Sequence, residues 1–242
     1  MLITKDLTKK YQEFTAVDKL NLKVKDGAIF GFLGHNGAGK TTTLSMLTTL
    51  ILPTSGTATI DSFDVVKDNL QVRNLLGYLP ENVRLYGDLT ARENLQFFGK
   101  LSKVEDVNKN IDEVLELLNF TGWTDKKVKT FSKGMRQRIG IAQAILHKPK
   151  ILFLDEPTSG LDPQGTKDIR NILLKINKDW GTTIFMNTHL LSEVTKICTD
   201  IGIISHGELL IADSIANLKE KFKDAKSLEE IYFTIEGGGV NE

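Results

Sequence analysis

The most constraining feature of the chain is a short apolar segment that runs directly into a glycine-rich loop. Residues 28–34, AIFGFLG, form an apolar run of strand length, and residues 34–42, GHNGAGKTT, follow it with three glycines, a lysine and two threonines. Residues 41–52, TTTLSMLTTLIL, then have the apolar content of a helix. The succession of buried strand, glycine loop and helix is typical of α/β folds that hold a phosphate group.

The loop fits the pattern G-x-x-x-x-G-K-[ST] at Gly34, Gly39, Lys40 and Thr41. Backbone N–H groups can wrap a phosphate chain only where side chains leave room, and the start of a helix adds partial positive charge. Lys40 supplies a point charge for the outer phosphates, and the Thr41 hydroxyl is a ligand for Mg²⁺. The residues expected to contact the phosphates are Gly34, His35, Asn36, Gly37, Ala38, Gly39, Lys40, Thr41 and Thr42. A chance glycine-rich turn is disfavoured by the flanking strand and helix.

A second strand carries acids at its end. Residues 151–156 read ILFLDE, so the strand brings Asp155 to the edge of the sheet where ligands of open α/β sheets bind. We expect Asp155 to hold Mg²⁺, directly or through water, and Glu156 to accept a proton from an attacking water. Two adjacent carboxylates repel each other, so this pair favours a nearby cation over a structural role.

The other elements follow from periodicity. Leu20, Leu22 and Val24 alternate with polar residues, as in a half-buried strand. Helical periodicity dominates from about residue 83 to 135, and later TTIFMN and IGIIS are typical of buried strands. One helix is predicted to begin with Asp162 as its cap and Pro163 in its first turn, and to end at Gly181. The alternation predicts an α/β fold with a mostly parallel sheet covered on both faces.

Charge and composition limit the partners. The chain balances 31 basic against 31 acidic side chains, and its one local basic stretch, residues 126–138, lacks a wider footprint, so no nucleic acid is expected. No run approaches the roughly 18–20 apolar residues of a membrane span, so work at a membrane would require spans from another chain. Cys198 is the single cysteine, and we interpret it as a small buried apolar residue.

The order of these motifs resembles one family. The segment FSKGMRQR, residues 131–138 (the signature segment), precedes ILFLDEPTSGLD and a later FMNTHLLSE. A phosphate loop alone is compatible with many nucleotide enzymes, but this ordered set, from about Leu2 to about Phe233, resembles the ATPase subunit of an ATP-binding cassette (ABC) transporter. The resemblance implies a P-loop NTPase core with N-terminal antiparallel strands and an inserted helical subdomain, with ATP and Mg²⁺ as cofactors.

The resemblance also implies roles for particular residues. Tyr11 matches the aromatic residue that stacks on adenine, and Val17 the apolar residue beside it. Ser132 and Gly134 match the positions that cap the γ-phosphate of ATP held by the opposite subunit. Asp162 matches the aspartate that links the two subunits' sites. His189 matches the switch histidine that contacts the γ-phosphate and the water. With Lys40 as the electrostatic clamp, Glu156 as the base and His189 as the switch, the expected reaction is hydrolysis of ATP.

Three positions depart from the family pattern. Glu81 stands where the family usually has a glutamine that senses the metal and faces the membrane partner; it can still bind Mg²⁺, but an ionised carboxylate donates no hydrogen bond. Met135 replaces a glutamine in the signature segment, so a polar contact to the nucleotide sugar is lost there. His35 stands where proline is common, at a position where the backbone does the binding.

The expected organisation is a single ABC ATPase domain over residues 1–242. Its core covers about 1–82 and 139–222, its helical subdomain about 83–138, and its short C-terminal tail 223–242. The implied partners are a transmembrane permease subunit and a second ABC ATPase subunit, in a homodimer or heterodimer at the cytoplasmic face of the membrane. The short C-terminal end and the signature resemble exporters of drugs, lipids or ions.

Three alternatives stay open from the sequence alone. A soluble ABC ATPase that acts on ribosomes or DNA usually carries a second cassette or a long coiled coil, and neither is present here. A regulatory module that binds but does not hydrolyse ATP is disfavoured by the Asp155–Glu156 pair and His189. A GTPase is disfavoured because Trp180 occupies the aspartate position of an N-K-x-D guanine motif.

Overall fold

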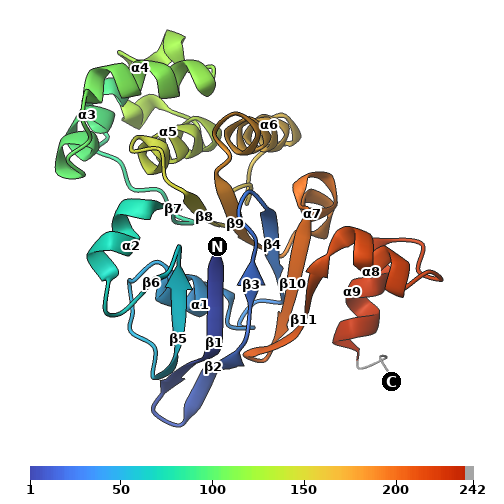
Figure 1. Ribbon diagram of the computed structural model, residues 1–242. Coiled ribbons are helices and arrows are strands. Elements are labelled where there is room, and N and C mark those ends of the chain that lie inside the picture. The colour runs from blue at the N-terminus through green and yellow to red at the C-terminus, as the bar shows by residue number, and fades with distance from the viewer. Residues whose placement is uncertain (238–242) are drawn as a thin grey trace.

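A six-stranded, mostly parallel sheet forms the centre of the protein (Figure 1). The computed structural model describes residues 1–237. The order of the strands across the sheet is β11-β10-β4-β9-β8-β7, and β11 alone among them runs antiparallel to its neighbour. Their bounds are β4 Ile29–Leu33, β7 Leu76–Leu79, β8 Ile151–Asp155, β9 Thr183–Thr188, β10 Asp200–Ser205 and β11 Glu208–Ser214. The predicted strands at residues 28–34, 151–155 and in TTIFMN and IGIIS are confirmed.

Both faces of this sheet are covered, which explains why its central strands are apolar throughout. In β4, Phe30 and Phe32 point into one core with the helix α1 (Lys40–Leu47), while Ile29 and Leu33 point into a second core with the helices on the opposite face. The side chains of a strand alternate between faces, so a strand buried on both sides loses the polar alternation of a surface strand. All five residues of β4 and of β8 are buried.

A second, antiparallel sheet packs beside the first, and it confirms the predicted N-terminal antiparallel strands. Its strands are β1 (Leu2–Tyr11), β2 (Phe14–Leu20), β3 (Lys23–Val24), β5 (Ser55–Ile60) and β6 (Phe63–Asp64). The strand predicted across Leu20, Leu22 and Val24 is divided between β2 and β3, although all three side chains are buried. The break arises because Asn21 bonds by its side chain to the backbone and carboxylate of Asp6.

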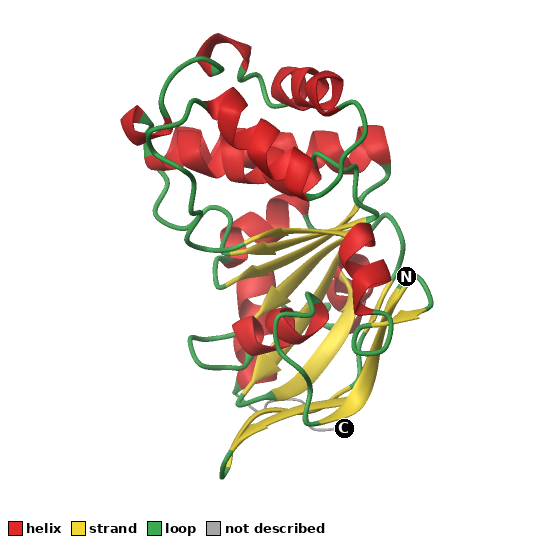
Figure 2. Cartoon of the chain, turned by 90° about the vertical axis from the view of Figure 1, so that its left-hand side faces the viewer, coloured by secondary structure: helices red, strands yellow, loops and turns green. Residues whose placement is uncertain are grey.

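Helices gather at one end of the molecule, beyond the main sheet (Figure 2). They are α3 (Ala91–Leu101), α4 (Val107–Leu117) and α5 (Lys133–Ile145), with short 3₁₀ turns at Thr121–Trp123 and Val128–Thr130. The predicted apolar face is buried in α4 and just after it, at Ile111, Val114, Leu115 and Leu118. Helix α5 continues past the proposed boundary at residue 138, because its second half lies against β7: a Cβ at Gly140 would lie 2.7 Å from the Leu79 side chain. The boundaries of the helical subdomain stay a prediction.

The remaining helices are α2 (Asn69–Leu75), α6 (Pro163–Trp180), α7 (Leu191–Ile197), α8 (Ile215–Lys221) and α9 (Leu228–Glu236). Helix α6 begins and ends where predicted: the Asp162 carboxylate accepts from the Gly165 N–H at 2.8 Å, and Gly181 adopts φ +67°. Helix α1 stops at Leu47, short of the predicted 52, and Thr49 adopts φ +63° just beyond it.

The proposed C-terminal tail, residues 223–242, contains a helix that was not predicted from the sequence. Leu228, Ile231 and Ile235 on one face of α9 are buried, and Ser227 caps its first turn. Residues 238–242 of that proposed tail lie outside the described residues. Among residues 1–237, no helix combines the length and the apolar content that crossing a bilayer requires.

Candidate functional site

The glycine-rich loop passes from β4 to α1 along a path that leaves no room for side chains. A Cβ at Gly34 would lie 2.3 Å from the Ile204 carbonyl oxygen, and one at Gly39 would lie 2.5 Å from that of Ala16. Gly37 and Gly39 also adopt φ +85° and +106°, a region that favours glycine. Glycine is therefore required at Gly34 and Gly39 by close backbone approach, and at Gly37 by backbone conformation.

Lys40, at the first position of α1, folds back over the loop. Its ammonium group donates to the carbonyl oxygens of Gly34 at 2.8 Å and of His35 at 3.1 Å. The side chain is buried, and this burial lowers the pKa of Lys40, while the nearby carboxylates of Glu156 and Asp155 raise it. A cation held in this way by weak carbonyl partners is available to an anion that enters the loop.

One cavity of about 610 Å³, here called the loop cavity, brings the loop together with the ends of the parallel strands. Its lining residues are Phe14, Ala16, Asn36, Gly37, Gly39, Lys40, Thr41, Thr42, Glu81, Glu156, Ser159 and His189. Of the loop residues predicted to contact phosphate, Gly34, His35 and Ala38 do not line it; Ala38 is fully buried. The structure therefore brings Glu81, Glu156 and His189, which lie far along the sequence, to Lys40 and Thr41 of the loop.

Asp155 sits behind the loop cavity at the end of β8. Its carboxylate accepts a hydrogen bond from the Asn187 side chain at 2.6 Å, across the β8–β9 pair. Burial raises the pKa of Asp155 most, and the charges of Glu156 and Glu81 raise it further, whereas the Asn187 hydrogen bond and Lys40 lower it. The ionised form of the Asp155 carboxylate therefore has too little positive charge around it, and a bound cation would stabilise that form.

The oxygen groups at this end suit Mg²⁺. The Thr41 hydroxyl, Asp155 and Glu81 are the hard oxygen donors that Mg²⁺ prefers. Among residues 1–237, no three His, Cys, Asp or Glu side chains are gathered closely enough to form a complete metal site. The two carboxylates and one hydroxyl that are present fit Mg²⁺, which is usually bound through one or two carboxylates and keeps several waters.

Glu156 is held in a specific orientation at the strand end. Its backbone adopts φ +47°, an uncommon conformation for a residue with a side chain. The Glu156 N–H donates to the Asn187 carbonyl at 2.9 Å. One carboxylate oxygen lies 2.8 Å from Nδ1 of His189, and the other accepts from the Thr188 hydroxyl at 3.3 Å. The Glu156 side chain is 11% exposed and that of His189 is 45% exposed. Both side chains line the loop cavity, and Glu156 is the more deeply buried of the two.

The signature residues lie in a different cavity, of about 410 Å³, here called the signature cavity. Ser132 begins α5 and accepts from the Met135 N–H at 3.3 Å, and Gly134 follows in its first turn. Asp162, the cap of α6, lines the same cavity. None of the lining residues is shared with the loop cavity. Within one chain, then, the two groups of predicted site residues stand apart.

Neither of the two predicted adenine contacts, Tyr11 and Val17, lines the loop cavity. Val17 is fully buried, and Tyr11, 48% exposed, does not line the loop cavity; the Lys9 ammonium lies over its ring at 5.1 Å. Phe14 and Ala16 line the cavity instead, and Phe14 pairs with Tyr11 across the β1–β2 hairpin. The stacking role of Tyr11 stays a prediction. Phe14 was not predicted as a site residue; the only sign in the sequence is that it is an aromatic residue three positions after Tyr11.

Comparison with known proteins gives a consistent result. The profile of a family described as "ABC transporter" matches residues 17–159. The bacitracin transport ATP-binding protein BcrA of Bacillus licheniformis is 45% identical over 218 residues, which are 90% of this chain and 71% of that protein.

Two solved structures have the same fold. One, an ATP-binding subunit of an ABC transporter, has a TM-score of 0.86 and 25% identity, and covers 97% of this chain and 99% of its own. The other is the dimeric ATP-binding cassette MJ0796 in a post-hydrolysis state with ADP and Pi. It has a TM-score of 0.79 and 26% identity, with 89% and 99% covered.

Proposed function

The chain belongs to the ABC transporter ATP-binding family and is an ABC-type ATPase, and from this premise we propose that it powers an exporter through a separate transmembrane permease. The observation that carries the proposal is the loop cavity, where Lys40, Glu156 and His189 meet beside the phosphate loop. The bacitracin transport relative supports a drug-like cargo class. The comparisons give no support to a ribosome- or DNA-bound ATPase.

The proposed reaction is the attack of water on the γ-phosphate of ATP, and the geometry supports a part for each of these residues. Glu156 accepts the proton of the water, since its carboxylate is oriented by His189 and Thr188. His189 lines the same cavity and contacts the γ-phosphate. Lys40 exchanges its carbonyl partners for phosphate oxygens and stabilises their charge. Thr41, Asp155 and Glu81 would hold Mg²⁺, which when bound neutralises phosphate charge.

The separate signature cavity supports action as a pair of cassettes. Ser132, Gly134 and Asp162 line a cavity that shares no residue with the loop cavity of their own chain. We expect them to cap the γ-phosphate of ATP bound by a second cassette, identical or related. The dimeric form of the cassette MJ0796 agrees with such an arrangement.

An exposed aromatic surface offers a place for the permease. The rings of Tyr86, Phe97 and Phe98 pack against one another with centroids 5.1–6.0 Å apart. Leu101, on α3 like Phe97 and Phe98, is 70% exposed. Asn94, buried in α3, bonds to both backbone groups of Tyr86 at 2.8 and 3.0 Å. Exposed apolar groups of this kind mark protein contact sites.

The same segment connects this aromatic surface to the loop cavity. Glu81 lines the cavity, and Tyr86 follows only five residues later. A shift of Glu81 on nucleotide binding would therefore be transmitted to the Tyr86 surface through a short loop. Docking of a permease here would place the chain at the cytoplasmic face of the membrane.

Turnover of Mg-ATP by the purified chain tests the proposed chemistry. Glu156→Gln should retain ATP binding and lower kcat by about 10²–10⁴-fold, the usual contribution of a general base. The matched control, Glu116→Gln, makes the same change at an exposed position on α4 and should leave kcat unchanged. Equal turnover by both variants would remove Glu156 from the mechanism.

A further inference from the structure

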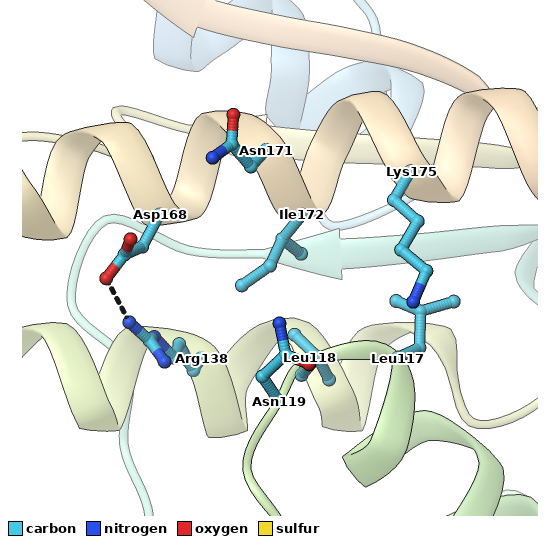
Figure 3. Close-up of a pocket in the computed structure, with 8 residues that line it drawn as sticks. All are labelled: Leu117, Leu118, Asn119, Arg138, Asp168, Asn171, Ile172 and Lys175. Carbon is cyan, nitrogen blue, oxygen red and sulfur yellow. Dashed lines mark hydrogen bonds and ion pairs between the residues drawn. The ribbon is translucent and has the colours of Figure 1, made fainter.

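An ion pair joins the helix that begins with the signature segment to the helix that begins at Asp162. Arg138 on α5 donates from its guanidinium to the carboxylate of Asp168 on α6, as Figure 3 shows. Both side chains are largely covered, at 24% and 29% exposed. Among residues 1–237, no other side-chain hydrogen bond or ion pair connects α5 directly to α6. The pair is therefore the one polar bridge between these helices in the described structure.

Open space lies on both sides of this bridge. On one side is the signature cavity, whose lining includes Ser132, Asp162 and both members of the pair. On the other side is a cavity of about 290 Å³ between the end of α4 and α6, lined by Leu117, Leu118, Asn119, Asn171, Ile172 and Lys175 together with the same pair (Figure 3). Core packing sets the overall arrangement of the two helices, since Ile139 of α5 and Ile169 of α6 are buried in the same core. Between the two cavities, the ion pair adds the polar contact that fixes the spacing of the helices there.

The bridge is connected to the first turn of each helix. The second oxygen of Asp168 accepts from the Gln164 amide at 2.7 Å, and Gln164 lies two residues after Asp162. On the other side, Arg138 lies six residues after Ser132 on the same helix. The Lys133 ammonium also covers Gly160, where a Cβ would lie 2.6 Å from it. A substitution at Asp168 would therefore alter the positions of both helix starts, the one at Ser132 and the one at Asp162.

We propose that Arg138 and Asp168 are positioning residues for ATP hydrolysis, because their ion pair holds Ser132 and Gly134 at the spacing from Asp162 that a second cassette's nucleotide requires. The inference rests on the proposed function as a paired ATPase. A guanidinium serves this purpose because its planar fork fixes direction as well as distance, whereas a lysine would supply only a point charge. Neither residue lines the loop cavity, so we expect both to act through the position of α5 and α6 and not through contact with their own chain's nucleotide.

The experiment measures ATP-dependent dimerisation separately from ATP binding. The parent is the full chain with Glu156→Gln, which should bind ATP without hydrolysing it and accumulate as the closed dimer. Asp168→Asn is added to this parent, and dimer formation is followed by light scattering over a range of ATP concentrations. Substitutions that act on a distant site without touching its ligand change the coupling by a modest amount, so we expect dimerisation to weaken by about 2- to 30-fold. Binding of a fluorescent ATP analogue to dilute monomer should stay unchanged.

Three further variants test the interpretation. Asp112→Asn is the matched control, because the Asp112 carboxylate pairs with Arg92 of α3 at 2.6 Å and not with a residue of α6. It should dimerise like the parent. The exchange Arg138→Asp with Asp168→Arg restores an ion pair of reversed polarity and should recover dimerisation, which general damage to the fold would not. Arg138→Lys, which keeps the charge, should give an intermediate loss.

The outcomes are distinct. Dimerisation of the Asp168→Asn variant at the same ATP concentration as the parent would overturn the inference while the proposed function stands. Equal weakening of monomer ATP binding would overturn it too, because the residue would then act on its own chain's site. A Glu156→Gln parent that binds ATP but never dimerises would refute the paired ATPase, and the inference with it.

Discussion

Replacing Arg170 with methionine should destabilise the protein through the helix that follows His189. Arg170 on α6 donates to both carboxylate oxygens of Glu193 on α7, at 3.1 and 3.0 Å. The Glu193 side chain is 6% exposed and that of Arg170 is 19% exposed, so the pair is shielded from water. Helix α7 has no side-chain cap at its start, which makes this pair an important anchor of the segment that carries His189.

The magnitude follows from what remains after the change. Removing one partner of a buried ion pair costs about 3–5 kcal/mol, because the other charge stays buried. Lys196 lies 3.3 Å from Glu193 and stays as a second partner, which puts the expected loss near the lower end, about 3 kcal/mol. At about 2–4 °C per kcal/mol for a chain of this size, Tm should fall by about 6–12 °C.

Thermal and denaturant unfolding of the parent chain and of Arg170→Met measure this loss. Addition of 1 M salt should change the difference in stability between them little, because the ion pair is buried. Turnover of ATP should fall as well, because the position of His189 depends on α7. The control is Lys196→Met, a change in a partly exposed cation that should cost under about 1 kcal/mol. Unfolding of Arg170→Met within about 0.5 kcal/mol of the parent would refute the reasoning.

Three further predictions concern the loop cavity. Lys40→Ala should weaken ATP binding by about 10- to 100-fold, the worth of a charge-assisted hydrogen bond, and a normal nucleotide titration would contradict this. Burial raises the pKa of Asp155 above 3.8, so the nucleotide-free chain loses stability as pH rises through that raised pKa; Asp155→Asn should remove this loss, measured as Tm against pH, and parallel curves would refute it. Phe14→Ala should weaken ATP binding by about 10-fold, more than Tyr11→Ala does, and the reverse order would restore the stacking role to Tyr11.

The parts of the site that the sequence predicts are those encoded locally. The phosphate loop requires glycine for reasons that operate within a few residues, and the run ILFLD places Asp155 at a strand end by itself. The caps of α6 are equally local, because Asp162 bonds to the N–H three residues on. These features need no knowledge of which strands are neighbours.

The features that the sequence does not predict depend on pairing between distant segments. Asn187 reaches Asp155, and Thr188 reaches Glu156, only because β8 and β9 are adjacent and in that register. The left-handed backbone of Glu156 leaves no mark in the sequence. The bridge from Arg138 to Asp168 likewise joins helices whose arrangement is set by the whole core.

Purification of this chain from gently solubilised membranes of its own source, with the bound polypeptides identified, tests the central claim most directly. The account predicts a protein with several membrane spans in roughly equal amount, and loss of that protein when Tyr86 and Phe97 are both replaced by serine. Recovery of ribosomal or DNA-bound proteins, with no membrane-spanning chain, would contradict the claim that this ATPase powers a transporter.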